Sequence, residues 1–170
     1  MPTNWYLFFA TALIPLVVGF FWYGNMGFGK KWMKVNGFTE ESLAGANMGL
    51  IFGLSYLFGL FISLTLSGIV VHQTSVFQVM MPGVAESGSA TQAQFNELMT
   101  TYGNNFRDFG HGALHGGFLA VMLAFPLIAI NSLFERRGWA YIGIHTGYWF
   151  VVFLLIGGVL CQFLQYAPAS

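Results

Sequence analysis

The stretch MGLIFGLSYLFGLFISLTLSGIVV, residues 48–71, decides the fold class of this chain. It carries no charged residue, and it exceeds the roughly 20 apolar residues that a helix needs to cross a bilayer core of about 30 Å. Its apolar side chains would cover every face of a helix, whereas a helix of a soluble bundle has one apolar stripe. This stretch therefore predicts a membrane-spanning helix.

Three more segments have the same character, at residues 4–24, 112–134 and 139–164. The first lacks the basic start and the small-residue cleavage site of a signal peptide, so we expect it to be retained as a helix. We therefore predict an all-α integral membrane bundle of four transmembrane helices, which forms a single membrane domain over residues 1–170.

The composition supports this fold class. The chain is 56% hydrophobic and only 7% charged, whereas a soluble domain carries about 25% charged residues. The formal net charge is zero, which argues against a nucleic-acid partner and leaves membrane lipid as the expected surroundings. The single cysteine, Cys161, excludes an internal disulfide and a cysteine-based zinc site.

The basic residues predict the orientation of the bundle. Five of the six lie in the first and third links between the spans: Lys30, Lys31, Lys34, Arg136 and Arg137. In a four-helix chain these two links share one side of the membrane, and the positive-inside tendency makes that side cytoplasmic. We therefore expect the two termini and the second link, residues 72–111, to face outward.

Both long links are expected to contain a helix. Thr39 can cap a helix that begins in the first link, before the second span enters the lipid. In the second link apolar residues recur at steps of three and four, and Thr91 and Gln94 have the spacing of a capping box. This pattern predicts an amphipathic outer helix over about residues 91–102 that ends at Gly103.

Small residues recur at every fourth position along the second span, which allows helices to approach closely in lipid. One row is Gly45, Gly49 and Gly53, and the other is Ser55, Gly59, Ser63 and Ser67. Two such faces predict two close neighbours, or one neighbour and a second copy of the chain. Pro15 and Pro126 lie inside the first and third spans, which they are expected to kink.

Histidines gather at the predicted outer end of the bundle. The stretch DFGHGALHGG, residues 108–117, puts Asp108 ahead of His111 and His115, which share one helix face. His72 ends the second span at the same level. Three imidazoles and a carboxylate are chemically sufficient to bind Zn, Fe, Ni or Cu, although no metalloprotease pattern such as HExxH accompanies them.

Three interpretations of this group stay open. In the first, which we favour, Asp108 interacts with the N-terminus of its helix and the imidazoles form hydrogen bonds at the membrane surface. In the second, His72, Asp108, His111 and His115 bind a transition metal, or the histidines bind haem. In the third, the histidines serve proton transfer or a quinone.

Two other polar residues are expected inside the spans. Asn131 lies in the third span, and His145 lies about 9 Å in from the cytoplasmic end of the fourth. An ionisable group in the membrane is a candidate for function, but a neutral imidazole can also form a structural hydrogen bond, with Asn47, Asn131 or Glu135 as expected partners. We favour the structural role. No charged residue lies at the centre of a span, so a proton pump within one chain is not expected.

Four stretches carry a resemblance to a known family: GFFWYGNMGFGKKWMKVNGFTEESLAGANMGLIFG, YGNNFRDFGHGALHGG, PLIAINSLFERRGWAYI and GYWFVVFLLIGG. In this order and spacing they resemble the bacterial membrane family known as domain of unknown function 1761, and in particular its Bacteroidota-type members. The resemblance covers nearly the whole chain and implies a small four-helix integral membrane protein of bacteria, which we expect in the inner (cytoplasmic) membrane. It implies no activity, so it assigns no catalytic residue.

The leading functional expectation is a non-enzymatic membrane module without a cofactor. It would pack through Gly45, Gly49, Gly53 and Gly59 against a second copy of the chain or within a larger membrane complex. One alternative is a metal- or redox-handling protein that uses the outer histidines. Another alternative is a small transporter formed by oligomerisation.

Overall fold

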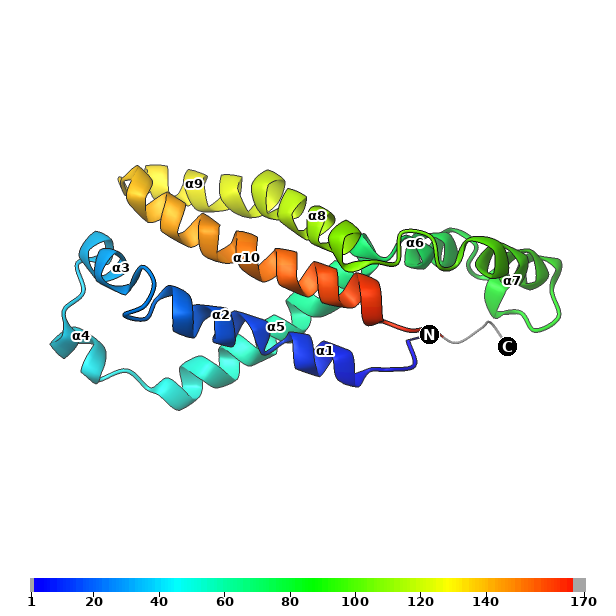
Figure 1. Cartoon of the computed structure of the whole chain (residues 1–170), viewed down its shortest axis with the longest axis horizontal. Helices are drawn as coiled ribbons and strands as arrows, with labels where there is room; N and C mark the ends of the chain where they lie inside the picture. Colours follow the sequence, from blue (N-terminus) through cyan, green and yellow to red (C-terminus); the bar gives the residue numbers. More distant parts are fainter. Residues whose placement is uncertain (1, 167–170) are drawn as a thin grey trace.

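The computed structural model describes residues 2–166, and all of their regular secondary structure is helical (Figure 1). The elements, in chain order, are α1 (Tyr6–Thr11), α2 (Ile14–Trp22), α3 (Gly29–Asn36), α4 (Glu40–Ala44), α5 (Met48–Val70), α6 (His72–Val79), η1 (Gly83–Ala85), α7 (Ala90–Tyr102), α8 (Phe109–Leu119), η2 (Ala120–Ala124), α9 (Phe125–Phe134) and α10 (Trp139–Phe163). An isolated bridge pairs Pro2 with Tyr166, so the two ends of the described chain meet.

Three helices are long and apolar enough to cross a membrane. They are α5, the continuous helix Phe109–Phe134 made of α8, η2 and α9, and α10. These helices match three of the predicted spans, with shifts only at their ends. The predicted first span, residues 4–24, is a shorter apolar segment, Tyr6–Trp22, divided into α1 and α2. The all-helical fold is confirmed, and three helices reach spanning length.

The prolines interrupt the helices in which they lie, as predicted. Pro15 occupies the first turn of α2, directly after the break that separates α1 from α2. Pro126 occupies the first turn of α9, and the turn before it, η2, is wound as a π-helix. Because proline has no backbone N–H and its ring crowds the carbonyl four residues earlier, each helix loses its regular bonding just before the proline.

α8 and α10 lie side by side with their backbones in contact (Figure 1). A Cβ atom added at Gly112 would collide with the Gly157 carbonyl and the Cys161 side chain, and one added at Gly116 would collide with the Phe153 carbonyl. Only glycine permits this approach, because a larger residue would force the helices apart. The contact fixes α8 against the second half of α10.

The buried core lies where α1, α5 and α10 meet. Its buried side chains include Leu7, Phe8, Leu66, Val70, Val152, Ile156 and Leu160. Gly59 lets α5 approach α1, since a Cβ there would lie 2.6 Å from the Ala12 carbonyl oxygen. The Thr11 hydroxyl donates a hydrogen bond to the Ser63 hydroxyl at 3.0 Å in the same contact. The second predicted row of small residues is therefore a helix contact within the chain.

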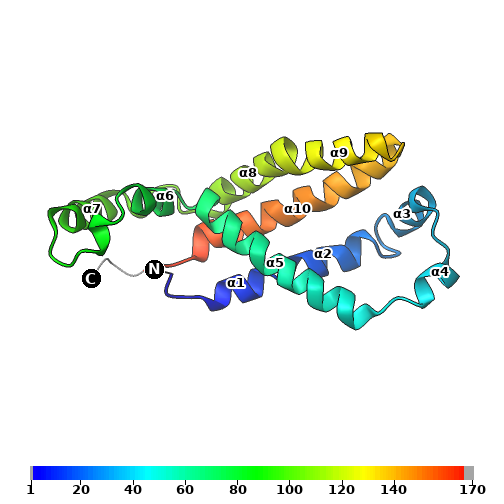
Figure 2. The same ribbon diagram turned by 180° about the vertical axis from the view of Figure 1, so that it is seen from behind.

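The first predicted row has no neighbouring helix among the described residues. Gly45, Gly49 and Gly53 are exposed, and a Cβ added at Gly45 or Gly53 would meet no atom within 4 Å. Gly45 ends α4, so only Gly49 and Gly53 lie on α5. The cause is the path of α5, whose N-terminal half diverges from the other long helices (Figures 1 and 2). This face is free for lipid or for another chain.

The second link contains two α-helices where one was predicted. The additional helix, α6, begins at His72 directly after α5, and no residue of α6 is fully buried. A short helix without a buried face has no apolar stripe that would mark it in the sequence. α6 and α7 extend together beyond the end of the long helices (Figure 1).

Helix caps decide where the link helices begin. Ser89, rather than the predicted Thr91, caps α7, because its hydroxyl accepts a hydrogen bond from the Gln92 N–H at 3.0 Å. Thr91 therefore lies inside the first turn, and the predicted capping box does not form. Thr39 caps α4 as predicted and accepts from the Ser42 N–H at 3.2 Å.

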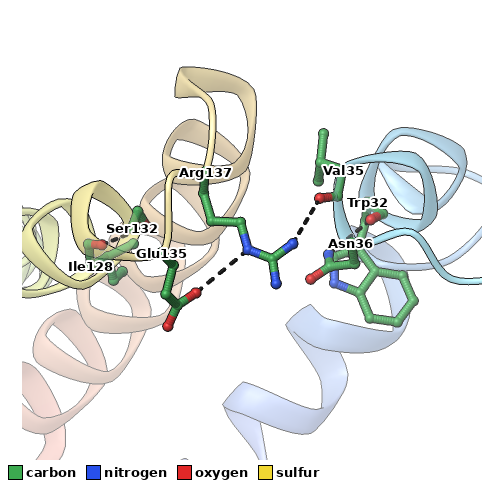
Figure 3. Close-up of polar contacts among 7 residues, drawn as sticks. All are labelled: Trp32, Val35, Asn36, Ile128, Ser132, Glu135 and Arg137. Atoms are coloured by element: carbon green, nitrogen blue, oxygen red, sulfur yellow. Dashed lines mark hydrogen bonds and ion pairs between the residues drawn. The ribbon is translucent and has the colours of Figure 1, made fainter.

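The two basic links lie at the same end of the molecule. Arg137, which pairs with Glu135 at 3.5 Å, donates a hydrogen bond to the Val35 carbonyl at 3.5 Å and so joins the third link to α3 (Figure 3). At the opposite end the Thr3 N–H donates to the Gln165 carbonyl at 2.8 Å. Following the predicted orientation, we name the end with the basic links the inner end and the other the outer end.

Candidate metal centre

Three histidines converge at the outer end, where α5, α6 and α8 meet. The Nε2 atom of His111 lies 2.8 Å from that of His72 and 3.1 Å from that of His115. One ligand atom from each ring lies within 4.8 Å of the others. His72 is exposed and the other two are half-buried, so solvent reaches this histidine cluster. The structure thus brings together three of the four residues singled out in the sequence.

Asp108, the fourth of these residues, is a helix cap. Its carboxylate accepts a hydrogen bond from the His111 N–H at 2.9 Å, in the first turn of α8. Its backbone, with φ −132° and ψ 162°, has the extended conformation of an N-cap residue. Among the described residues its carboxylate does not belong to the converging group. Asp108 therefore has the capping role that the first interpretation gave it.

Local structure brings the three rings together. His111 and His115 are one helical turn apart on α8, and their ring centroids are 4.5 Å apart. Val71 is fully buried and ends α5 in an extended conformation, with φ −104° and ψ 96°. His72 is therefore the first residue of a new helix, and its ring centroid lies 5.0 Å from each of the other two.

Hydrogen bonding alone satisfies this arrangement poorly. A ring nitrogen of neutral imidazole has either one N–H or one lone pair. The Nε2 atom of His111 can therefore pair well with His72 or with His115, but not with both. A cation at the centre would instead accept a lone pair from all three rings at once.

The spacing fits a first-row transition-metal ion. At a Zn–N distance of about 2.0–2.1 Å, tetrahedral ligands lie about 3.3 Å apart, which is close to the 2.8 and 3.1 Å separations in the cluster. Three protein ligands leave a fourth position for a solvent molecule. Imidazole suits Zn, Cu, Ni and Fe. The rings are too close together for a haem to lie between two of them.

Phe106 forms a wall of the cluster and was not identified from the sequence. Its ring stacks on His111 with 5.0 Å between centroids and an angle of 29°, and it meets His72 edge-on at 6.1 Å. Its φ of 60° lies in the left-handed region, which a bulky residue rarely adopts. Such strain persists only where surrounding contacts hold it. The sequence offers no periodicity that would signal this conformation.

Two contacts from α10 and its end hold the loop that carries Phe106. The Cys161 thiol donates to the Phe106 carbonyl at 3.2 Å, and the Arg107 guanidinium donates to the Leu164 carbonyl. Burial lowers the pKa of Arg107, while nearby Cys161 and Tyr166 act in the opposite direction. The segment that precedes α8 is thus bound to the outer end of α10 and to the residue that follows it.

The fourth histidine, His145, lies near the start of α10 and does not join the cluster. Its Nδ1 atom shares a hydrogen bond of 3.1 Å with the Tyr23 hydroxyl. The predicted partners are wrong: the Asn47 side chain caps α5, Glu135 forms an ion pair within its own link, and Asn131 is exposed. The partner that sequence reasoning missed, Tyr23, directly follows the first apolar segment.

These features define the class: an all-helical protein with three apolar helices of membrane-spanning length and three histidines gathered at one end. The chain belongs to the family described as Protein of unknown function (DUF1761), whose model matches residues 6–161. The match confirms the resemblance carried by the sequence motifs. No curated protein and no solved structure matches the chain.

Proposed function

We propose that this chain is a membrane protein that binds a transition-metal ion at its outer end through His72, His111 and His115. The observation that carries the proposal is the convergence of three imidazole nitrogens within 4.8 Å of one another. Two histidines one turn apart would meet on any helix, but His72 is 39 residues from His111 and lies on a different element. A shared ion accounts for the meeting of all three.

We propose an exchangeable binding site and no enzymatic activity. Within residues 2–166 the Nδ1 atoms of the three rings have no hydrogen-bond partner, whereas metal-ligating histidines usually have one that orients the ring and strengthens binding. We therefore expect an ion here to be held weakly enough to exchange. The nearest candidate for a general base in the sequence, Asp108, accepts the hydrogen bond of the helix cap. The cluster thus offers three metal ligands and an open coordination position, but no neighbouring side chain placed to act as a general base.

Passage of the ion through a single chain is not part of this proposal. Gly112 and Gly116 each follow a histidine of α8, and both lie against the backbone of α10. This contact leaves no space for an ion between the two helices. Binding or sensing at the surface is therefore favoured over transport by one chain.

We also propose four membrane crossings, with α1 and α2 together making the first. At the outer end the Asn4 amide donates to the Phe163 carbonyl at 2.8 Å, and farther in the Trp22 indole donates to the Ile144 carbonyl at 3.0 Å. From Ile144 to Phe163 a helix rises about 29 Å at 1.5 Å per residue, which is close to the thickness of a bilayer core. The divided segment therefore covers about the same height as α10.

The proposed location is the bacterial inner membrane, with the basic links in the cytoplasm. The lysine link and the arginine link share one end, where Arg137 reaches the Val35 carbonyl (Figure 3). The positive-inside tendency then directs the histidine cluster and both ends of the described chain outward. Metal ions would reach the cluster from the outer aqueous phase.

Association is the second part of the proposal. Gly49 and Gly53 of α5 are exposed, and no helix of the described chain covers them. In lipid a small-residue face lets another helix approach closely. We propose that this face of α5 packs against a second copy of the chain or within a larger membrane complex.

Elemental analysis of the detergent-purified chain tests the metal proposal. The protein is incubated with Zn²⁺, Cu²⁺, Ni²⁺ or Fe²⁺, desalted and analysed beside a His111→Ala/His115→Ala variant. We expect about one ion per parent chain for at least one metal, its loss in the double variant and its retention in the control His145→Ala. Less than about a tenth of an ion per chain for every metal, or equal content in parent and double variant, would refute the proposal.

A further inference from the structure

We infer that a metal ion in the histidine cluster fastens the outer hairpin, defined as α6, η1 and α7 (residues 72–102), to membrane helix α8. The inference rests on the proposed metal site. His72 is the first residue of the hairpin, whereas His111 and His115 belong to α8. One ion bound by all three residues would therefore join the two ends of the outer segment of the chain.

The outer hairpin buries little apolar surface of its own. No residue of α6 is fully buried, η1 buries only Val84, and α7 buries only Gln92 and Phe95. Phe77 of α6 meets Phe95 with 5.7 Å between ring centroids, so this apolar contact lies inside the hairpin. The hairpin extends past the long helices in both views (Figures 1 and 2). An element with so few buried apolar contacts opens locally at low free-energy cost.

Polar contacts attach the hairpin to its surroundings next to His72. The Gln73 amide donates to the Asn105 carbonyl at 3.1 Å, and the hydroxyls of Thr74 and Tyr166 share a hydrogen bond of 2.8 Å. The Oε1 atom of Gln73 is buried without a partner, so this attachment is incompletely satisfied. The histidine cluster lies at the same attachment point and is the place where an ion would strengthen it.

The junction before His72 is where α6 can pivot. The helical hydrogen bonding of α5 stops at Val71, whose side chain is fully buried and whose backbone is extended. α6 can therefore turn about this junction without disturbing the core below it. An ion that holds His72 against α8 restrains the pivot at its first residue. The metal concentration outside would then set how firmly the hairpin is held.

Hydrogen exchange of the full chain in detergent, with and without Zn²⁺, tests this inference. If α6 opens only when His72 releases the ion, exchange of the α6 amides slows by about 100-fold at a free zinc concentration about 100 times the dissociation constant. Exchange in α4, at the inner end, remains unchanged. The zinc content of the same sample is measured in parallel.

His72→Ala is the matched control. His111 and His115 can still hold zinc together, so α8 should be protected while α6 exchanges at its zinc-free rate. In the parent chain, bound zinc with unchanged α6 exchange would overturn the inference and leave the metal site standing. A parent chain that binds no zinc would overturn both. Zinc-dependent protection of α6 in His72→Ala would also overturn the inference, because the link would not pass through His72.

Discussion

The two ends of α10 lie beside histidines in opposite circumstances. At the outer end, the Nε2 atom of His111 lies within 3.1 Å of two other imidazole nitrogens. At the inner end, the Nδ1 atom of His145 shares one hydrogen bond with the Tyr23 hydroxyl, and its Nε2 atom is buried without a partner. A hydroxyl pairs with one imidazole nitrogen through a single hydrogen bond, whereas three imidazole nitrogens that face one another can share a cation. The role of a histidine therefore depends more on the groups that its ring nitrogens face than on its depth in the membrane.

Glycines show the same contrast between the ends. Gly112 and Gly116 bring α8 into backbone contact with α10 at the outer end, while Gly49 and Gly53 on α5 lie exposed toward the inner end. Both pairs have the same spacing of four residues. Spacing alone thus identifies a face that can be approached, and the path of the helix decides whether a neighbour is there.

The largest effect is expected from Gly116→Leu. The new side chain would collide with the Phe153 carbonyl, and overpacking of this kind costs about 1–3 kcal/mol or more. The unfolding temperature in detergent should fall accordingly. The matched change Gly53→Leu should leave the stability of the monomer unchanged and reduce the size of any oligomer formed through α5. Equal destabilisation of the monomer by both changes would remove the contrast between the two rows.

The next effect is on metal affinity. His111 contributes the nitrogen that lies closest to both others. Loss of a supporting group around a metal ligand costs about 10–100-fold in affinity, so His111→Ala, which removes a ligand, should weaken zinc binding by at least about tenfold in calorimetric titrations. His145→Ala should bind zinc as the parent does. A parallel loss of affinity in both variants would place the metal elsewhere.

Two substitutions of Asp108 distinguish a helix-capping role of this residue from a metal-binding role. Asp108→Ala should destabilise the chain by about 1 kcal/mol, whereas Asp108→Asn, which can still cap α8, should change stability little. Zinc content should be unchanged in both variants, because the carboxylate binds the His111 N–H. Loss of zinc from Asp108→Asn at unchanged stability would show that Asp108 is a fourth ligand.

The smallest effect is expected at the inner end. Tyr23→Phe removes the hydroxyl that pairs with His145 and should lower the free energy of unfolding by about 0.5–1.5 kcal/mol. Zinc affinity and oligomer size should be unaffected. A change in zinc affinity would mean that the two ends are coupled and that the histidines do not act separately.

The features that depend only on hydropathy and on spacing along the chain could be predicted from the sequence. Hydropathy gave the approximate extents of the three long helices, because spanning length and apolar content are local properties. His111 and His115 share a face since they are one turn apart, and His72 lies at the same level because it follows the end of the neighbouring span. Their meeting within hydrogen-bond distance required the break at Val71, which hydropathy does not register.

The features that depend on distant partners could not be predicted. Tyr23 and His145 are 122 residues apart, and no local pattern joins them. Phe106 lies against the cluster through a strained φ that is stabilised by contacts with α10. The exposed face of Gly53 results from the divergence of α5, which the small-residue pattern does not encode.

X-ray absorption at the zinc edge of the loaded parent chain tests the three-histidine site most directly. Binding through His72, His111 and His115 predicts about three nitrogen ligands at about 2.0–2.1 Å, the outer-shell scattering of imidazole rings and about one further light ligand. The same spectrum should be absent from the His111→Ala/His115→Ala variant. A first shell of oxygen without imidazole scattering, or an unchanged spectrum in the double variant, would contradict metal binding at this cluster.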